Sequence, residues 1–312
     1  MNAEAPLILF DSRMRFLAPH LAGYRLIDWH VKSSAPTTEA IDEVRAAVTV
    51  GDEPLPPHIE ALPHLGLLAV TGAGFDGIQT DRLFARGIEI THSPGANAPD
   101  VADHAMALFL ALQRRVIDGD RRVRDGSWVD YAMVLQMPSI RDLRVGILGM
   151  GAIGEQLAKR LAAFDCPIRW HGPRPRPGIG YPRADSLIDL ARDSDVLFLA
   201  HRANDSNRGL IDGVVLDALG PKGLLVNISR GLAIDEALLI DALRRGRIAG
   251  AAIDVFDPEP VTDARWADAP NCVLSPHVGG VGLGSWATIG KMVRNNLDLF
   301  FAGQPVANPI PR

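Results

Sequence analysis

Short runs of apolar residues alternate with longer amphipathic or polar segments along almost the whole chain. Runs that are apolar at nearly every position are typical of strands buried on both faces, as in a parallel sheet. The first series of expected strands covers 6–10, 24–30, 46–50, a helix that runs into a strand at 59–70, and 87–95. The second series covers 143–149, 167–172, 195–201, 223–229, 248–256 and 271–277. The repeated strand–loop–helix spacing predicts an α/β protein built on parallel sheets.

Helical periodicity marks four further segments. The segment 101–118 is apolar at helical spacing, and Pro99 and Asp100 before it are helix start signals. Its length of about 18 residues suits a link between two domains, and its small apolar face suits a subunit interface as well as core packing. The other helices are expected at 153–164, 235–246 and 285–303. Because no strand follows the last helix, it could return to pack on the first domain.

The composition is that of an ordinary globular protein. With 312 residues, 47% of them hydrophobic and 22% charged, the chain is long enough for two domains. The net charge of −5 argues against a general nucleic-acid binder, and the locally basic stretch 114–124 is interpreted as a solvated helix face. No run of about 18 apolar residues occurs, so no transmembrane helix is expected.

Two cysteines, Cys166 and Cys272, are far apart in the sequence and form neither a CxxC motif nor a metal-ligand spacing. Free, buried thiols are therefore expected, and no metal site. The N-terminus carries no signal-peptide pattern, because the apolar stretch 5–10 is too short and Asp11 follows it. A cytoplasmic protein is expected.

A glycine-rich loop directly follows the expected strand 143–149. Gly149, Gly151 and Gly154 form a GxGxxG pattern that ends the strand and begins a helix. The first glycine allows the tight turn, the second lets the backbone approach a pyrophosphate, and the third allows the helix to pack closely on the strand. The helix N-terminus, at Ala152 and Ile153, offers free N–H groups and the positive end of the helix dipole. In this context the pattern predicts a dinucleotide site.

The end of the next strand bears on the choice between NAD and NADP. An acidic residue about 20 residues after the glycine loop normally binds the ribose hydroxyls and repels a 2′-phosphate. From Arg169, at the end of this strand, no acidic residue occurs before Asp185. Arg174 and Arg176 in this stretch instead offer planar donors that suit a phosphate. We therefore expect NADP(H) to be preferred, with NAD(H) possible. The alternative is that the two arginines only belong to a solvated loop.

Three separated polar residues follow apolar strands in the last third of the chain. Arg230 lies in the segment NISRG, Glu259 in DVFDPEP and His277 in SPHVGG. Each is expected at the carboxyl end of a strand, which is where ligands bind in open α/β sheets. A cation, a carboxylate and an imidazole beside a dinucleotide site are the parts needed to reduce a 2-oxo acid.

These motifs together resemble the D-2-hydroxyacid dehydrogenases, and within them the glyoxylate/hydroxypyruvate reductases. The matching segments, in the family's order over nearly the whole chain, are TGAGFDGI (71–78), GANAPDVADHAMAL (95–108), VGILGMGAIG (145–154), NRGLID (207–212), LVNISRGLAIDEALLIDAL (225–243), GAAIDVFDPEP (250–260) and LSPHVGG (274–280). The resemblance implies two flavodoxin- or Rossmann-like domains with parallel sheets and an active site in the interdomain cleft. The substrate domain would comprise 1–98 plus 286–312, and the dinucleotide-binding domain 99–285. It also implies a homodimer that pairs through the cofactor domain.

The resemblance assigns roles to the three polar residues. Arg230 matches the arginine that grips the substrate carboxylate and polarises the 2-oxo group. His277 matches the acid/base that gives a proton to the carbonyl oxygen while hydride arrives at C2. Glu259 matches the carboxylate that orients this imidazole and stabilises its protonated form.

Further positions match the family less directly. Asp254, an acid at the end of an apolar strand, matches the residue that binds the nicotinamide carboxamide. Ala73 and Gly74 match the loop whose backbone N–H groups receive the substrate carboxylate, an approach that glycine-rich backbone leaves open. His104 fits the family's helix pattern and is interpreted as a structural histidine. His201 lies where many relatives carry a Cys-Pro-Leu-Thr-like stretch, which leaves the cofactor contacts of this loop open.

The expected function is the NADPH-dependent reduction of a small 2-oxo acid, such as glyoxylate or hydroxypyruvate, to the D-2-hydroxy acid. Larger 2-oxo acids of the 2-ketogluconate or phenylpyruvate type remain alternatives. From another class, the family's fold also serves cofactor-sensing transcriptional corepressors, which carry extra interaction tails. The chain begins a few residues before its first expected strand and ends at Arg312, so the enzyme is favoured. A dehydrogenase acting on a phosphorylated serine precursor usually brings extra regulatory domains, and none is expected here.

Overall fold

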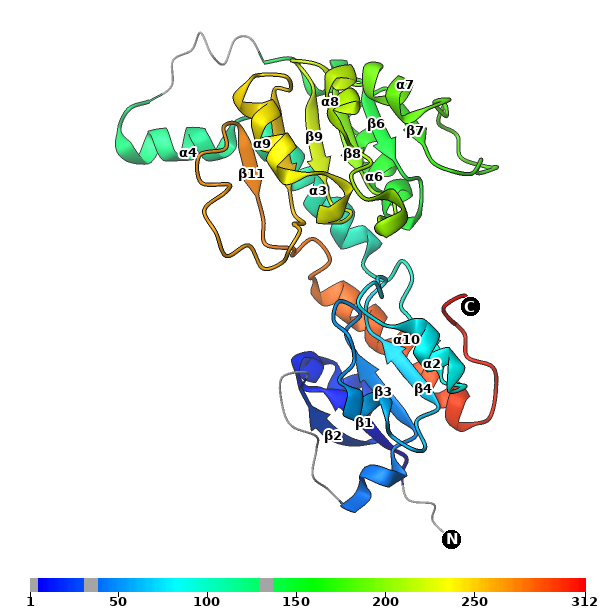
Figure 1. Cartoon of the computed structure of the whole chain (residues 1–312). Helices are drawn as coiled ribbons and strands as arrows, with labels where there is room; N and C mark the ends of the chain where they lie inside the picture. Colours follow the sequence, from blue (N-terminus) through cyan, green and yellow to red (C-terminus); the bar gives the residue numbers. More distant parts are fainter. Residues whose placement is uncertain (1–4, 31–38, 129–136) are drawn as a thin grey trace. The chain divides into compact units, whose positions relative to one another are not determined.

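The computed structural model describes residues 5–30, 39–128 and 137–312. The chain divides into two compact units, the first made of Met1–Asn97 with Gly282–Arg312 and the second of Ala98–Val281. Each unit is a parallel sheet with helices on both of its faces (Figure 1). The predicted α/β class with two parallel sheets is therefore confirmed.

The first unit holds a five-stranded sheet in the order β2–β1–β3–β4–β5, with every pairing parallel. This is the flavodoxin-like order, in which the chain changes direction across the sheet at its first strand. The strands are β1 (Leu7–Asp11), β2 (Arg25–Trp29), β3 (Ala46–Thr49), β4 (Leu67–Val70) and β5 (Glu89–Thr91). One face carries the 3₁₀ segment η1 (Ser12–Leu21) and the long helix α10 (Leu283–Phe301). The other face carries η2 (Glu39–Glu43), α1 (Pro57–Glu60) and α2 (Thr80–Ala85).

The second unit holds a six-stranded parallel sheet in the order β11–β10–β9–β8–β6–β7. The strands are β6 (Val145–Leu148), β7 (Ile168–His171), β8 (Val196–Leu199), β9 (Leu224–Asn227), β10 (Gly250–Ile253) and β11 (Cys272–Leu274). One face is covered by α3 (Ala98–Gln113) and α6 (Ala152–Ala162), and the other by α7 (Leu187–Arg192), α8 (Gly213–Leu219) and α9 (Glu236–Arg244). The chain passes from β6 to β7 on one side and later to β8 on the other. The carboxyl ends of β6 and β8 thus form a switch point, where open α/β sheets bind ligands.

The strand predictions succeed because the apolar runs are buried on both faces. Every residue of β3, β4, β6, β8, β9 and β10 is buried. The short helices α2, α7 and α8 were not predicted, since they are too short to show a helical period. Two of them start at local capping signals: Ser186 caps α7 by accepting from Asp189 N, and Asp212 caps α8 by accepting from Val214 N and Val215 N.

The predicted helix 101–118 is wrong beyond Gln113. The structure ends α3 there and starts a second helix, α4 (Val116–Asp125), after Arg115 adopts a left-handed φ of 52°. Residues such as Phe109 and Leu112 give α3 an apolar face that packs on the sheet. No residue of α4 is buried, so α4 lacks the apolar packing on the sheet that α3 has. The basic stretch 114–124 begins at the break between the two helices and continues along α4.

Both cysteines are free thiols. Cys166 is buried as expected, whereas Cys272 on the edge strand β11 is only half-buried. Burial nevertheless raises the pKa of Cys272 to about 12, which keeps it a neutral thiol at physiological pH.

Within the described residues, no helix has the length and apolar character needed to span a membrane.

Candidate active site

The glycine loop lies at the switch point of the second unit. Gly149 has a φ of 94°, and a Cβ on it would lie 2.4 Å from the Cα of His201, so only glycine fits. A Cβ on Gly154 would lie 2.1 Å from the carbonyl oxygen of Gly149, which is the close helix–strand packing that the motif predicts. Among the described atoms, none outside its chain neighbours lies within 4 Å of a Cβ built on Gly151. Open space at the start of α6 is what a phosphate needs, so the loop fits a dinucleotide.

The structure brings one of the two predicted phosphate-binding arginines to this loop. The guanidinium of Arg176 donates to the Met150 carbonyl at 2.6 Å and to Glu155 Oε1 at 2.8 Å. Arg174 lies two residues earlier in the same segment after β7 and is exposed. Arg176 therefore lies beside the glycine loop, and the binding of a 2′-phosphate by Arg174 and Arg176 stays a prediction.

His201 follows β8 and packs against the other side of the glycine loop. Both of its ring nitrogens are buried, and no hydrogen-bond partner for them occurs among the described residues. Burial lowers its pKa to about 4, so the imidazole is neutral at physiological pH. The backbone of His201 lies directly against Gly149, so this residue borders the glycine loop.

Arg230 is presented by a tight turn after β9. Asn227, which is 1% exposed, accepts hydrogen bonds from N and Oγ of Ser229 at 3.1 and 3.0 Å and donates to the Arg230 carbonyl at 3.1 Å. A Cβ on Gly231 would lie 1.9 Å from the carbonyl carbon of Phe256, so glycine is required where the turn meets the segment after β10. The Arg230 guanidinium donates to the Ser229 carbonyl at 2.8 Å. The asparagine and the glycine thus fix a turn that holds the arginine at the carboxyl edge of the sheet.

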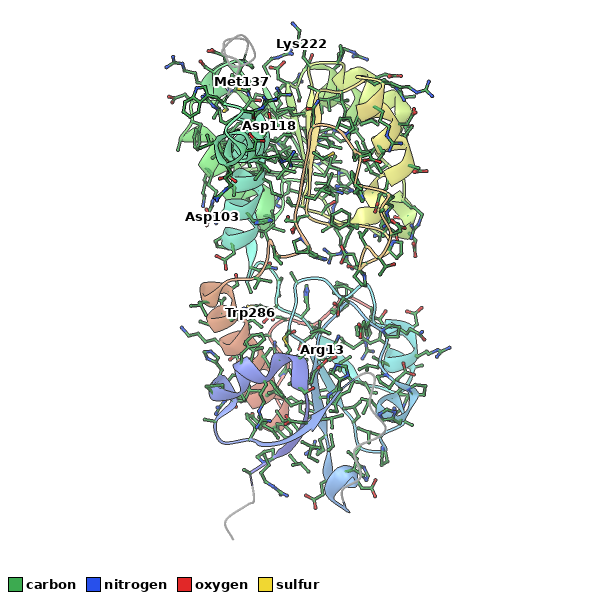
Figure 2. All side chains as sticks on the ribbon, turned by 90° about the vertical axis from the view of Figure 1, so that its left-hand side faces the viewer. Arg13, Asp103, Asp118, Met137, Lys222 and Trp286 are labelled. Atoms are coloured by element: carbon green, nitrogen blue, oxygen red, sulfur yellow. The ribbon has the colours of Figure 1, made fainter. Side chains whose placement is uncertain are left out.

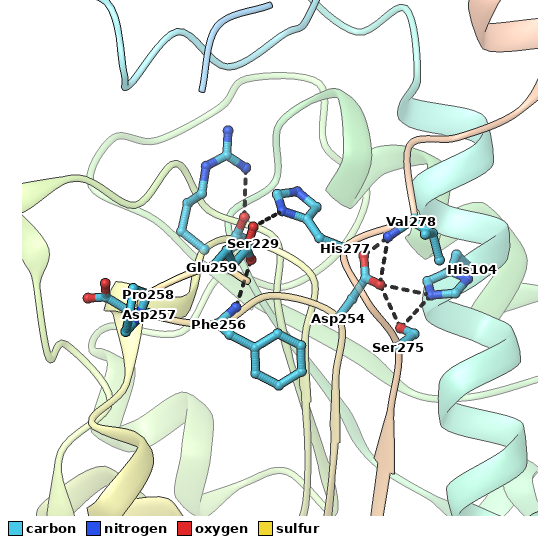
Figure 3. Close-up of polar contacts among 12 residues, drawn as sticks. His104, Ser229, Asp254, Phe256, Asp257, Pro258, Glu259, Ser275, His277 and Val278 are labelled. Carbon is cyan, nitrogen blue, oxygen red and sulfur yellow. Dashed lines mark hydrogen bonds and ion pairs between the residues drawn. The ribbon is translucent and has the colours of Figure 1, made fainter. Parts of the chain in front are cut away.

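Glu259 and His277 come from two different loops and meet at the same edge. His277 Nδ1 lies 2.6 Å from Glu259 Oε2 (Figure 3). The other carboxylate oxygen of Glu259 accepts from Phe256 N at 2.8 Å. His277 has a left-handed φ of 52°, which is uncommon for a residue other than glycine, and its side chain is 41% exposed. With Nδ1 bound to Glu259, Nε2 is the nitrogen that can exchange a proton with a ligand.

The charged groups of this cluster shift one another's pKa values. The hydrogen bond to Glu259 raises the pKa of His277, against burial and the charge of Arg230, which both lower it. Burial alone would raise the pKa of Glu259. The hydrogen bonds from His277 and Phe256 N, with the charge of Arg230, outweigh burial and lower this pKa. Glu259 is therefore ionised, and His277 keeps its proton to higher pH than free imidazole, as a general acid requires.

Asp254 holds the backbone around His277. Asp254 is buried, and its Oδ1 accepts from Ser275 Oγ at 2.6 Å and from Val278 N at 3.1 Å. Its Oδ2 accepts from Gly279 N at 2.9 Å, and its carbonyl accepts from His277 N at 2.8 Å. The structure thus shows Asp254 binding its own chain. The contact with a nicotinamide carboxamide that the resemblance implies stays a prediction.

A second buried carboxylate, which the sequence did not reveal, supports the Glu259 loop. Glu236 is 9% exposed and accepts from Asp257 N and from Trp266 Nε1, both at 2.7 Å. Arg265 lies within ion-pair distance of it, at 2.7 Å. An acidic residue in the first turn of a helix is favoured by the helix dipole alone, so the sequence offered a sufficient local explanation for Glu236.

The remaining predicted residues, Ala73 and Gly74, lie after β4 in the first unit. His92 Nδ1 lies 2.9 Å from the Ala73 carbonyl oxygen. A Cβ on Gly51 would lie 2.1 Å from the Gly74 carbonyl oxygen, so this turn packs tightly on the segment after β3. The role of their backbone N–H groups in binding a carboxylate stays a prediction.

Among the described residues, no three His, Cys, Asp or Glu side chains gather in a way that could hold a metal ion.

Comparison with known proteins adds to this geometry. The model of the family described as "D-isomer specific 2-hydroxyacid dehydrogenase, NAD binding domain" matches residues 106–279. The glycine loop, Arg230, Glu259 and His277 all lie within the matched stretch. A glyoxylate/hydroxypyruvate reductase A of Arabidopsis thaliana is 38% identical over 252 residues, which is 81% of this chain and 80% of the relative.

A bacterial relative and a solved structure extend the comparison. A 2-ketogluconate reductase of Gluconobacter oxydans is 36% identical over 268 residues, 86% of each chain. The crystal structure of an NADPH-dependent glyoxylate/hydroxypyruvate reductase from Sinorhizobium meliloti, in complex with NADP and malonate, aligns with a TM-score of 0.84. That alignment covers 98% of this chain and 97% of the other, at 31% identity.

Proposed function

Because the chain belongs to the D-isomer specific 2-hydroxyacid dehydrogenase family, we propose that it reduces a small 2-oxo acid of the glyoxylate or hydroxypyruvate type with NADPH. The product is the D-2-hydroxy acid. The observation that carries this proposal is the 2.6 Å contact between His277 Nδ1 and Glu259 Oε2, with Arg230 close enough for its charge to act on both. This arrangement holds a protonated imidazole beside a guanidinium, and a 2-oxo acid needs both.

The three side chains have complementary tasks in the proposed reaction. Arg230 binds the substrate carboxylate and polarises the 2-oxo group through its planar donors. His277 donates the proton on Nε2 to the carbonyl oxygen, which would otherwise become an alkoxide. Glu259 keeps Nδ1 of that ring protonated and fixes the direction in which Nε2 points.

The second unit provides the place for a nicotinamide cofactor. When bound, the cofactor supplies the hydride that arrives at C2 of the substrate. The glycine loop fits its pyrophosphate, because the space beside Gly151 is open and α6 begins there, and the first N–H groups of a helix are free to bind a phosphate. We assign the preference for NADP to Arg174 and Arg176, whose guanidinium groups suit a 2′-phosphate. NAD(H) remains a possible second cofactor.

Relatives of this chain are named for 2-oxo acids of different sizes. The Arabidopsis relative is named for glyoxylate and hydroxypyruvate, whereas the Gluconobacter relative is named for 2-ketogluconate. A reductase of larger 2-oxo acids, of the 2-ketogluconate or phenylpyruvate type, is therefore the alternative. The catalytic groups do not separate the two, because each acid presents the same carboxylate and 2-oxo group to Arg230 and His277.

Initial rates with a panel of acids test the proposal. Glyoxylate, hydroxypyruvate, pyruvate, 2-ketogluconate and phenylpyruvate are each offered with NADPH and with NADH. We expect the highest kcat/KM for glyoxylate or hydroxypyruvate with NADPH. The highest value with one of the larger acids would favour the alternative. Cofactor binding without turnover of any acid would contradict an enzyme and favour a cofactor-sensing protein.

Two arginine substitutions separate cofactor preference from activity. In the double variant Arg174→Ala/Arg176→Ala, the KM for NADPH should rise about ten- to a hundredfold, the loss expected for charged hydrogen bonds to a phosphate. The KM for NADH should change little, because NADH lacks that phosphate. Arg192→Ala, which removes an exposed arginine of α7 paired with Asp189, is the matched control. Equal weakening of both cofactors would show that Arg176 acts by holding the glycine loop.

We further propose that the protein is a homodimer that pairs through the second unit, as the resemblance implies. Helix α4 carries no buried residue, and Val116, Ile117 and Val123 on it are each more than half exposed. Apolar side chains on an otherwise charged helix suit burial against a second copy. Sedimentation equilibrium should give twice the mass of one chain, and Val116→Glu/Val123→Glu should reduce it to one. A monomeric wild-type protein would contradict this proposal.

The cytoplasmic location stays a prediction.

A further inference from the structure

His104, on the linking helix α3, reaches the loop that bears His277 (Figure 3). We propose that His104 is a positioning residue of the reaction, whose Nε2–H fixes Ser275 and Asp254 and thereby the place of His277 against Glu259. The inference rests on the proposed function, since it concerns the same general acid. It gives a task to a histidine that the sequence offered only as a structural residue.

The contacts of the ring define its task. His104 Nε2 lies 2.9 Å from Ser275 Oγ and 3.2 Å from Asp254 Oδ1. The imidazole therefore approaches the same carboxylate oxygen that accepts from Ser275 Oγ and from Val278 N. The side chain of Asp254 is 3% exposed and that of His104 is 23% exposed, so water has little access to this group of bonds. In a site of that kind each donor to the carboxylate counts for more than it would in water.

The hydrogen positions follow from the distances. Ser275 Oγ is only 2.6 Å from the anionic Oδ1 of Asp254, so its single hydrogen points there. The Ser275 oxygen then faces His104 Nε2 with a lone pair. Nε2 also faces Oδ1 of Asp254. Without a hydrogen on Nε2, the lone pair of this nitrogen would point at the lone pairs of both oxygens and be repelled by them. The tautomer that carries hydrogen on Nε2 satisfies both, and His104 donates to the pair.

Packing ties the same ring to the backbone. A Cβ on Gly279 would lie 2.8 Å from Asp254 Oδ2 and 3.3 Å from Cδ2 of His104. The loop therefore packs against both the carboxylate and the imidazole at Gly279, with no room there for a larger residue. Val278 and Gly279, whose N–H groups bind Asp254, directly follow His277 in the chain. A change in the direction of the Asp254 carboxylate is therefore transmitted to His277 through one or two peptide units.

The consequence is a change in the basicity of His277. Glu259 from the loop after β10, Arg230 from the turn after β9 and Asp254 at the end of β10 are the charged groups that act on its ring. The hydrogen bond to Glu259 is the largest of these influences and raises the pKa of His277. A displacement of the loop that carries His277 would lengthen this short contact. The pKa of His277 should then fall, and the imidazolium needed for reduction should be lost at lower pH than in the wild-type enzyme.

Two substitutions with different donors test the role. His104→Leu keeps an apolar body against Gly279 and removes the donor. His104→Gln places an amide NH₂ near the position of Nε2 and restores it. The pKa of His277 is measured by NMR on histidine-labelled protein, with the resonance assigned through His277→Asn. In His104→Leu we expect this pKa to fall by about half a unit or more. The kcat should fall about tenfold, with the alkaline limb of its pH profile shifted in the same direction. His104→Gln should return both values close to the wild type.

Asp103→Asn is the matched control on the same helix. Asp103 is exposed on the surface of α3 (Figure 2), and its carboxylate accepts from Arg160 Nε on α6 at 2.6 Å. This variant loosens α3 against α6 and should leave the pKa of His277 unchanged. If His104→Leu does not fold, His104→Asn replaces it, because an asparagine amide reaches only the position of Nδ1.

The outcomes separate this inference from a merely structural role and from the proposed function. A lower melting temperature in His104→Leu with an unchanged pKa of His277 would overturn the positioning role. A His104→Gln enzyme as impaired as His104→Leu would do the same. If the wild-type protein reduces no 2-oxo acid, the proposed function fails, yet the NMR titration still decides whether His104 controls the pKa of His277.

Discussion

Replacing His277 with asparagine should lower kcat for reduction of the preferred 2-oxo acid by about 10²- to 10⁴-fold, the usual contribution of a positioned general acid. Asparagine cannot give up a proton at physiological pH, so the developing alkoxide would have to take one from water. Cofactor affinity should not change, because the glycine loop and its arginines lie outside the contacts of His277. Stopped-flow single-turnover rates and fluorescence titration with NADPH measure the two quantities separately. His64→Asn, which replaces an exposed histidine of the first unit, is the control and should keep full activity.

The reducing activity should depend on pH through the protonation of His277. The raised pKa of His277 means that the wild-type enzyme holds the proton below that pKa and loses reducing activity as the pH rises through it. In Glu259→Gln the ring loses both the charge and the charged hydrogen bond that raise its pKa, while burial still lowers it. The alkaline limb of the kcat profile should therefore move to lower pH. A limb at the same pH in Glu259→Gln and wild type would show that another group supplies the proton.

The second large effect is expected at Arg230. Arg230→Gln should lower kcat/KM about 10²- to 10⁴-fold, because two charged hydrogen bonds of about 1.5–3 kcal/mol each would be lost. The loss should appear in KM through the substrate carboxylate and in kcat through the polarised carbonyl. Arg230→Lys keeps the charge without the planar fork and should recover only part of the activity. Steady-state kinetics over a range of substrate concentrations separates the two terms.

The same variant makes a second, opposite prediction for His277. The charge of Arg230 lowers the pKa of His277, so Arg230→Gln should move the alkaline limb to higher pH. Glu259→Gln moves it to lower pH, and a general loss of structure would not shift the two variants in opposite directions. Arg192→Gln, which replaces an exposed arginine of α7, controls for the loss of one positive charge. Near-normal kcat/KM in Arg230→Gln would remove this residue from the proposed mechanism.

Much of the site could be predicted because its parts are marked locally in the sequence. Gly149, Gly151 and Gly154 stand where a strand ends and a helix begins, so their spacing marks the loop in the sequence, whereas the close contact of Gly149 with His201 is seen only in the structure. Arg230 and His277 follow apolar strands directly, so the rule that ligands meet the carboxyl edge of a parallel sheet placed them together. The burial of whole strands turned apolar runs into reliable strand predictions.

The residues that support the site could not be found in the same way. His104 and Ser275 are 171 positions apart, and their contact exists only because α3 packs beside the end of β10. Glu236 has a local explanation as a helix-start residue, which hides its bonds to Asp257 and Trp266. In each case the sequence is explained by a structural role within the residue's own helix. The contacts that support the site come from segments far away in the chain and are seen only in the folded structure.

The sequence by itself determined the α/β class, the glycine loop and the three polar residues at strand ends, because periodicity and motif spacing are properties of neighbouring residues. The tertiary structure decided where α3 ends and how Arg176 meets the glycine loop. It also decided that the buried carboxylate of Asp254 binds the loop around His277. These features depend on which surfaces are buried against one another, and burial is fixed only when distant segments pack.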